Sequence, residues 1–434
     1  RPMRKIITLL LLAVTMTVTA QDFNHYFEDA TLRLDYIFAG NAKHQTIAVD
    51  ELSRIPRWYG KHERLAEVPV EGNGQVTVRD HRTQKVIYRN SFSTLFQEWL
   101  TNDEAQKPSQ KSFENVFLVP FPKDSVDITV ELRNNRREVT VSMTHTVVPR
   151  DILIRRIGER SVTPYETLQK AADTTRCIHI AYIAEGYTET EMSNFIEDCR
   201  TANEALFAHE PFKSLRQRFN VVAVKSLSAE SGTSEPSKGI WKNTALHSHF
   251  DTFYSDRYLT TLHLKELHDW LAGTPYEHII VLVNTEKYGG GGILNSYNLS
   301  MVRNPYFKPV VVHEFGHSFA GLGDEYAYDK EQINMYPTDV EPWEPNLTTL
   351  VDFHGKWENL INKKTPVPTP QPDLDKSNAR HDKWKVGAYE PAGYSQHGVY
   401  RAYPDCRMRT NMHPEFCPAC TLGLTKLIKF YTGE

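Results

Sequence analysis

The chain has 434 residues, of which 40% are hydrophobic and 24% are charged, so it can bury two ordinary cores. Its formal net charge of −4 argues against a nucleic acid as the partner. Beyond the first residues no apolar run is long enough to cross a bilayer, so we expect no membrane span in the rest of the chain. Nothing in the composition predicts an oligomeric state.

The first residues have the pattern of an export signal. Arg4 and Lys5 precede an apolar run over residues 6–14, and small residues up to Ala20 suit a signal peptidase. We therefore expect residues 1–20 to be a signal peptide. The protein would then be secreted, periplasmic or attached to the cell surface.

Residues 21–150 alternate apolar and polar side chains, as half-buried strands do. The alternation is clear over residues 32–38. It is clearest in residues 126–132 and 139–143, which a turn at residues 134–135 joins as a hairpin. The pattern predicts an all-β sandwich domain. Three of its aromatic residues, which we assign to the core rather than to a carbohydrate-binding platform, are Trp58, Tyr59 and Trp99.

A charged segment at residues 150–164 separates this region from one with alternating strands and helices. Thr188 and Glu191 form a capping box at the start of an amphipathic helix. The order predicts an α/β domain over residues 160–434. Its expected strands are residues 178–184, 219–224 and 278–284, and a second helix is expected over residues 258–272.

The most informative stretch contains His313 and His317. Four residues apart on a helix, their imidazoles lie on one face and can bind one ion. Glu314 points about 100° round the helix, where it can accept a proton from a metal-bound water instead of binding the metal. This HExxH spacing is typical of zinc peptidases, and it predicts one zinc ion per chain. The first side chains after the helix that could bind the metal through a carboxylate oxygen are Asp324 and Glu325.

The run HEFGHSFAGLGDEY resembles the active-site helix of the IgA peptidase family M64, which belongs with the metzincin zinc endopeptidases. The resemblance extends from about residue 160 to the C-terminus, and the preceding part resembles the β-rich domain of bacterial members. It implies a metzincin-like α/β (α+β) catalytic domain that hydrolyses protein or glycoprotein substrates. Gly321 and Asp324 each lie one residue later than the metzincin pattern places them. We take Asp324 as the third ligand, with Glu325 as the alternative.

A glycine run at residues 289–292 precedes this helix. A phosphate loop is disfavoured because no Lys-Ser or Lys-Thr follows the run and because the next element has a strand pattern. In metzincin-like folds an edge strand holds the extended substrate, and this segment lies where such a strand is expected.

Two features follow the helix. Residues 329–382 are rich in proline and polar residues and predict a surface insertion or flap. The segment ending in Cys406-Arg407-Met408-Arg409 resembles the M64 segment whose methionine forms the Met-turn beneath the metal, so Met408 is our candidate and Met412 the alternative. Tryptophans that could line a substrate cleft, but that we expect to pack the insertion onto the domain, are Trp343, Trp357 and Trp384.

The cysteines near the C-terminus allow several interpretations. Cys417 and Cys420 have the CxxC spacing of a redox motif or of half a zinc site. We favour a disulfide from Cys406 to one of these two residues.

Together these features predict an exported zinc endopeptidase. His313, His317 and Asp324 hold the metal and leave one position open, and Glu314 is the general base. Two alternatives are an exported glycoprotein-binding or adhesion protein with a structural metal, and a zinc amidase acting on cell-wall peptides. The sequence does not specify the substrate. The candidates for the oxyanion-stabilising residue are Tyr326, Tyr400 and Tyr403.

Overall fold

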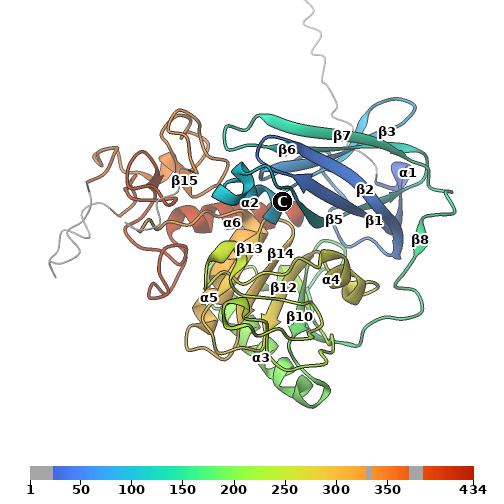
Figure 1. The fold of residues 1–434 in the computed structure, drawn as a ribbon. Helices are drawn as coiled ribbons and strands as arrows, with labels where there is room; N and C mark the ends of the chain where they lie inside the picture. The colour runs from blue at the N-terminus through green and yellow to red at the C-terminus, as the bar shows by residue number, and fades with distance from the viewer. Residues whose placement is uncertain (1–22, 329–334, 371–384) are drawn as a thin grey trace, which may run out of the picture.

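The computed structural model describes residues 23–328, 335–370 and 385–434 (Figure 1). The predicted signal peptide and two parts of the predicted insertion lie outside the described residues. The described chain has a mixed α/β fold with several sheets. In this part of the chain, no helix has both the length and the apolar character needed to cross a membrane.

The N-terminal part forms two four-stranded sheets that share one core (Figure 1). Leu34 and Tyr36 are fully buried, as their alternation predicts, and Tyr36 reaches across to His145 of the second sheet. The predicted hairpin is confirmed as β6 and β7, which pair antiparallel. One sheet has the order β5 (Lys111–Pro122), β1 (Phe27–Gly40), β2 (Gln45–Pro56), β8 (Arg155–Arg156), and the other has the order β4 (Val86–Phe92), β3 (Gly74–Asp80), β6 (Val126–Arg133), β7 (Val139–Val147).

The second part of the chain is built around a six-stranded sheet. Four central strands are parallel, and one antiparallel strand lies at each edge. The glycine run forms an edge strand, as predicted. The order is β13 (Gly290–Ile293), β14 (Tyr297–Met301), β12 (His278–Val283), β10 (Ile178–Glu185), β11 (Phe219–Val224), β9 (Tyr165–Gln169).

The helices predicted from the sequence are present, except that the one expected over residues 258–272 is shorter. The capping box of Thr188 and Glu191 is present before α3. The helix predicted over residues 258–272 is wrong in its first part: α4 is only Leu264–Leu271, because Tyr258 and Thr260 form β-bridges instead. The remaining elements are α1 (Phe23–Tyr26), α2 (Leu95–Leu100), α3 (Met192–Leu206), α5 (Phe307–Ala320), α6 (Pro418–Tyr431) and a small sheet of β15 (Leu347–Thr348) with β16 (Tyr400–Arg401).

The six-stranded sheet is buried on both faces. On β10, Ile180 and Tyr182 pack into the core that contains side chains of α3, α5 and α6. Ala181 and Ile183 point the other way, into the core that also contains the N-terminal sheets. The apolar core therefore continues from the N-terminal sheets into the six-stranded sheet, and the domain boundary at residues 150–164 stays a prediction.

A buried ion pair joins the two parts of the chain. Arg33 on β1 is 1% exposed, and its Nε lies 2.7 Å from Asp35 Oδ1. The same guanidinium donates to Asp269 and to the Lys265 carbonyl of α4. Because a buried charge is costly unless it is paired, Arg33 and Asp35 depend on each other.

We predict that Arg33→Ala lowers the free energy of unfolding by about 3–5 kcal/mol, because it leaves the Asp35 carboxylate buried and unpaired. Arg155→Ala is the matched control, since Arg155 pairs with Glu51 at an exposed site and the loss should be at most about 1 kcal/mol. Urea unfolding monitored by fluorescence measures both values. Equal losses in the two variants would contradict the prediction.

Candidate metal centre and active site

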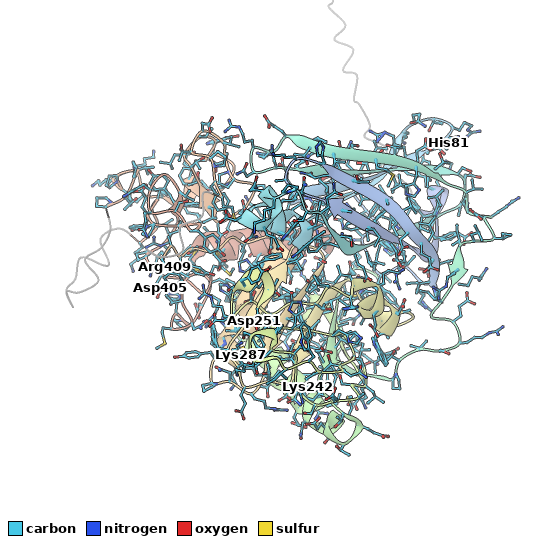
Figure 2. The ribbon with its side chains drawn as sticks, in the orientation of Figure 1. His81, Lys242, Asp251, Lys287, Asp405 and Arg409 are labelled. Atoms are coloured by element: carbon cyan, nitrogen blue, oxygen red, sulfur yellow. The ribbon has the colours of Figure 1, made fainter. Side chains whose placement is uncertain are left out.

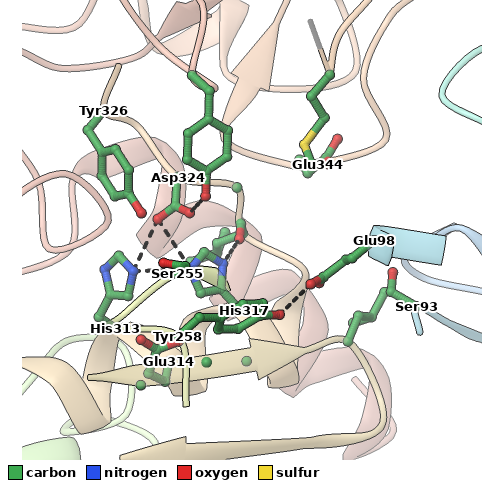
Figure 3. A pocket seen from close by; sticks show the side chains of 18 of the residues that line it. Ser93, Glu98, Ser255, Tyr258, His313, Glu314, His317, Asp324, Tyr326 and Glu344 are labelled. Atoms are coloured by element: carbon green, nitrogen blue, oxygen red, sulfur yellow. Dashed lines mark hydrogen bonds and ion pairs between the residues drawn. The ribbon is translucent and has the colours of Figure 1, made fainter. Parts of the chain in front are cut away.

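The centre is built on α5 and on the turn that follows it. His313 and His317 lie one helical turn apart, with their Nε2 atoms 3.1 Å from each other. The helix ends at Gly321, whose φ of 61° is left-handed and whose N–H donates to the carbonyls of Gly316 and His317. This turn reverses the chain and brings Asp324 back over the two imidazoles (Figure 3).

Three side chains form a triangle of ligand atoms. Asp324 Oδ1 lies 3.1 Å from His313 Nε2 and 3.3 Å from His317 Nε2. A tetrahedral zinc ion with bonds of about 2.0–2.1 Å has ligand atoms about 3.3–3.4 Å apart, so the triangle fits one face of its coordination shell. Asp324 Oδ1 is buried and, apart from its approach to the two imidazoles, has no hydrogen-bond partner among the described residues, so it is available to bind a metal ion.

The outer nitrogens of both histidines are held by backbone carbonyls. His313 Nδ1 lies 3.0 Å from the Arg407 carbonyl, and His317 Nδ1 lies 2.5 Å from the Leu322 carbonyl. A proton on each Nδ1 leaves each Nε2 free to bind a metal, which is the usual arrangement around metal-ligating histidines. Burial lowers the pKa of His317, but the charge and hydrogen bond of Asp324, the charge of Glu314 and the hydrogen bond to Leu322 together outweigh burial and raise the pKa to about 9. A cation inside the triangle would replace that proton.

Glu314 lies beside the triangle, on the side of the glycine strand. A Cβ placed on Gly290 would lie 2.6 Å from Glu314 Oε1, so the absence of a side chain there lets β13 pass close to the carboxylate. Burial raises the pKa of Glu314, although His313 and His317 act in the opposite direction. The outer edge of β13 is covered in part, because Tyr258 bridges Gly290.

The centre opens into a cavity of ≈ 540 Å³ (Figure 3). One wall comes from the N-terminal part of the chain and includes Glu98 of α2, which accepts a hydrogen bond from Tyr258. Burial raises the pKa of Glu98 to about 7. The sequence carries no motif that would have identified Glu98 or Tyr258 as cavity residues.

The structure distinguishes the residues that the sequence left as alternatives for the third metal ligand and for the Met-turn. Glu325 points away from the histidines, and its Oε1 lies 3.0 Å from Asn346 Nδ2 and 3.2 Å from Cys420 Sγ. Met408 is fully buried against α5, where a Cβ on Gly316 would lie 2.8 Å from its sulfur. Met412 is 80% exposed.

Among the tyrosines considered for the oxyanion, Tyr326 lines the cavity. The cavity lining does not include Tyr400 or Tyr403. A residue that the sequence did not reveal, Tyr394, donates a hydrogen bond to Asp324 Oδ2 and packs edge-on against Tyr326. Tyr394 lies in a segment without a recognisable motif, so only its position in space identifies it.

The prediction for the cysteines was wrong, and those for the tryptophans and Tyr59 were confirmed only in part. The predicted disulfide is wrong, because all five cysteines are free and Cys406 Sγ lies 3.7 Å from Cys420 Sγ. Trp343 lines the cavity, whereas Trp357 is fully buried. Trp384 lies outside the described residues. Trp58 and Trp99 are buried core residues, as predicted, and Tyr59 is partly buried against His179.

Two family models match most of the chain, but neither reaches residues 384–434, which include Met408 and the C-terminal cysteines. The family described as IgA Peptidase M64 matches residues 167–383, and the family described as Peptidase M64 N-terminus matches residues 22–144. The chain belongs to peptidase family M64. The predicted family is therefore confirmed, and membership supports a metallopeptidase with a protein substrate.

Comparisons of this M64 peptidase with individual proteins give little information beyond the family. No curated protein matches it. One solved structure, the crystal structure of metalloproteinase-II from Bacteroides fragilis, is 13% identical and covers 57% of this chain and 83% of its own. Its TM-score of 0.21 is too low for it to carry an argument about the fold or the site.

We predict that Tyr394→Phe weakens zinc binding by about 10–100-fold, because the lost hydroxyl no longer orients the Asp324 carboxylate. Competition with a chromophoric chelator measures the dissociation constant. Tyr400→Phe serves as the control, since that ring lies outside the cavity lining. An unchanged dissociation constant in Tyr394→Phe would show that the hydrogen bond does not position the ligand.

Proposed function

We propose that this M64 peptidase is an exported zinc endopeptidase with a metzincin-like catalytic domain. The observation that carries the proposal is the triangle of His313, His317 and Asp324, which faces a cavity with Glu314 beside it. The donor set of two imidazoles and one carboxylate suits a catalytic zinc ion with one open position. Export rests on the signal pattern of residues 1–20 and would place the enzyme outside the cytoplasm.

In the proposed hydrolysis the metal activates the water and the scissile carbonyl, and side chains carry out the proton transfers. When bound, zinc lowers the pKa of a coordinated water to about 7 and polarises the scissile carbonyl. Glu314 accepts a proton from the attacking water and then donates it to the amine nitrogen of the leaving group. Its raised pKa suits both steps, because a carboxylate with a pKa nearer neutrality takes up and releases a proton more readily.

Tyr326 is the proposed oxyanion-stabilising residue. It lines the cavity, and burial together with the Asp324 charge raises the pKa of its hydroxyl far above the usual range. The hydroxyl therefore stays protonated and can donate a hydrogen bond to the developing negative charge. Met408 supplies an apolar floor beneath α5 and does not compete as a ligand.

We predict that Glu314→Gln keeps the zinc but lowers peptide hydrolysis by about 10²–10⁴-fold, because it removes the proton acceptor and leaves the ligands in place. His313→Ala should lose the zinc ion of this site together with the activity. The measurement combines metal analysis with mass spectrometry of peptides released from a mixed proteome by the chain from Gln21 onward. If Glu314→Gln cleaves as fast as the wild type, Glu314 is not the general base.

The same assay separates the peptidase from the alternatives. Chelator-sensitive cleavage of folded or denatured proteins supports the endopeptidase. Release of peptides from purified peptidoglycan alone would instead indicate an amidase. Full zinc loading without hydrolysis of either substrate would indicate a binding protein.

A second prediction concerns the glycine strand. Gly290→Ala places a Cβ within 3.0 Å of three atoms of the Glu314 side chain and should displace the carboxylate, so we expect cleavage to fall by about 10²-fold with the zinc retained. Gly355→Ala is the control, since its Cβ would meet no atom within 4 Å. Steady-state kinetics on a peptide identified in the proteome assay, together with metal analysis, measure the effect. Unchanged kinetics in Gly290→Ala would mean that the contact does not constrain Glu314.

A further inference from the structure

A second group of metal-binding side chains lies behind the first. Glu325, Cys406, Cys417 and Cys420 come from three separate segments, and all four are buried. One ligand atom from each residue lies within 4.8 Å of the others. Neither the proposed mechanism nor the family comparison uses these residues, although Glu325 directly follows the candidate ligand Asp324.

The distances within this group match a tetrahedral zinc site. Zinc–sulfur bonds of about 2.3 Å place two sulfur ligands about 3.8 Å apart and a sulfur and an oxygen about 3.6 Å apart. The Sγ atoms of Cys406 and Cys420 are 3.7 Å apart. Glu325 Oε1 lies 3.2 Å from Cys420 Sγ and 3.8 Å from Cys417 Sγ.

The surroundings favour charged ligands. Backbone N–H groups of Cys417 and Met408 point at Cys406 Sγ, at 3.1 Å and 3.4 Å, which suits a thiolate acceptor. Asn346 Nδ2 donates to Glu325 Oε1 at 3.0 Å and fixes the carboxylate. Cys417 is the N-cap of α6 and Cys420 lies in its first turn, where the helix dipole stabilises negative charge.

One carboxylate oxygen in the group is buried without a hydrogen bond that would compensate for its lost hydration. Glu325 Oε2 is buried without a hydrogen bond among the described residues. A buried carboxylate is costly unless a cation or hydrogen bonds compensate it. The buried guanidinium of Arg401 lies near enough to stabilise the charge, but its Nη atoms donate to the carbonyls of Pro391 and Pro404. A divalent cation would compensate both the carboxylate and the thiolates.

We infer that Glu325, Cys406, Cys417 and Cys420 form a second, structural zinc site. Four protein ligands leave no open position for water, which is the property of a structural site and not of a catalytic one. The ion would tie the chain beside Asp324 to the loop that carries Met408 and to the start of α6. The inference does not rest on the proposed function, because it requires no hydrolysis.

The loop that carries Cys406 and Met408 is held in place on its other side as well. Asp405 accepts hydrogen bonds from Thr410 Oγ1 at 3.0 Å and lies 3.7 Å from Arg409 (Figure 2). The adjoining carbonyl of Arg407 binds His313 Nδ1. A metal at the second site would therefore position groups that contact the first site.

The test counts zinc ions in the full chain after loading with Zn²⁺ under reducing conditions. We expect about two ions in the wild type and about one in the variant His313→Ala/His317→Ala, which keeps the second site intact. Adding Cys417→Ser and Cys420→Ser to that variant should remove the remaining ion. Cys177→Ser is the control, because this buried cysteine lies outside the group and the zinc count should not change.

Replacement of zinc by Co²⁺ provides a spectroscopic measurement that needs no substitution of the four proposed ligands of the second site. The first site has no sulfur ligand, so a thiolate-to-cobalt charge-transfer band in the near ultraviolet would come from the second site. We expect this band in the wild type, in Cys177→Ser and in the histidine double variant. A folded histidine double variant without metal, a cobalt protein without the band, or a disulfide from Cys406 to Cys417 or Cys420 in the reductively purified protein would each overturn the inference.

Discussion

The left-handed turn at Gly321 is the constraint on which the candidate metal centre depends. A helix alone brings His313 and His317 together, but it carries the chain away from them. The turn at Gly321 reverses the chain within four residues of His317, so that the Leu322 carbonyl meets His317 and Asp324 faces both imidazoles. A side chain at Gly321 would be strained at this φ, and its Cβ would lie 2.4 Å from Trp343.

The C-terminal loop completes the centre from the other side of α5. The Arg407 carbonyl orients His313, and the sulfur of Met408 fills the space that Gly316 leaves on the helix. Glu325, next to Asp324, reaches the cysteines of the same loop and of α6. Neighbouring acidic residues thus point to opposite sides of one segment, and each meets a different set of donor atoms. This arrangement links the geometry of the first site to the packing behind it.

The N-terminal sheets take part in the site as well as in the fold. They share an apolar core with one face of the six-stranded sheet, and Arg33 ties β1 to α4. Through α2 they place Glu98 in the wall of the cavity, where it pairs with Tyr258. A substrate in this cavity would contact both parts of the chain, which gives the N-terminal part a role in shaping the site.

The sequence alone determined the features that depend on local periodicity. The spacing of His313 and His317, the alternation in β1 and the capping box before α3 follow from the geometry of a helix or a strand, so residues close in the chain were sufficient. The same local reasoning failed at residues 258–263, where bridges to distant segments replaced the expected helix. It also predicted a disulfide where the structure has free thiols.

Only the tertiary structure decided which residues meet across long separations. The sequence favoured Asp324 as the third ligand but left Glu325 as an alternative. In the structure Asp324 contacts His313, whereas Glu325 contacts Cys420. Tyr394 and Glu98 reach the cavity from segments without motifs. The reason is physical: a ligand set is specified by distances between side chains in the folded state, and those distances depend on packing that no local pattern encodes.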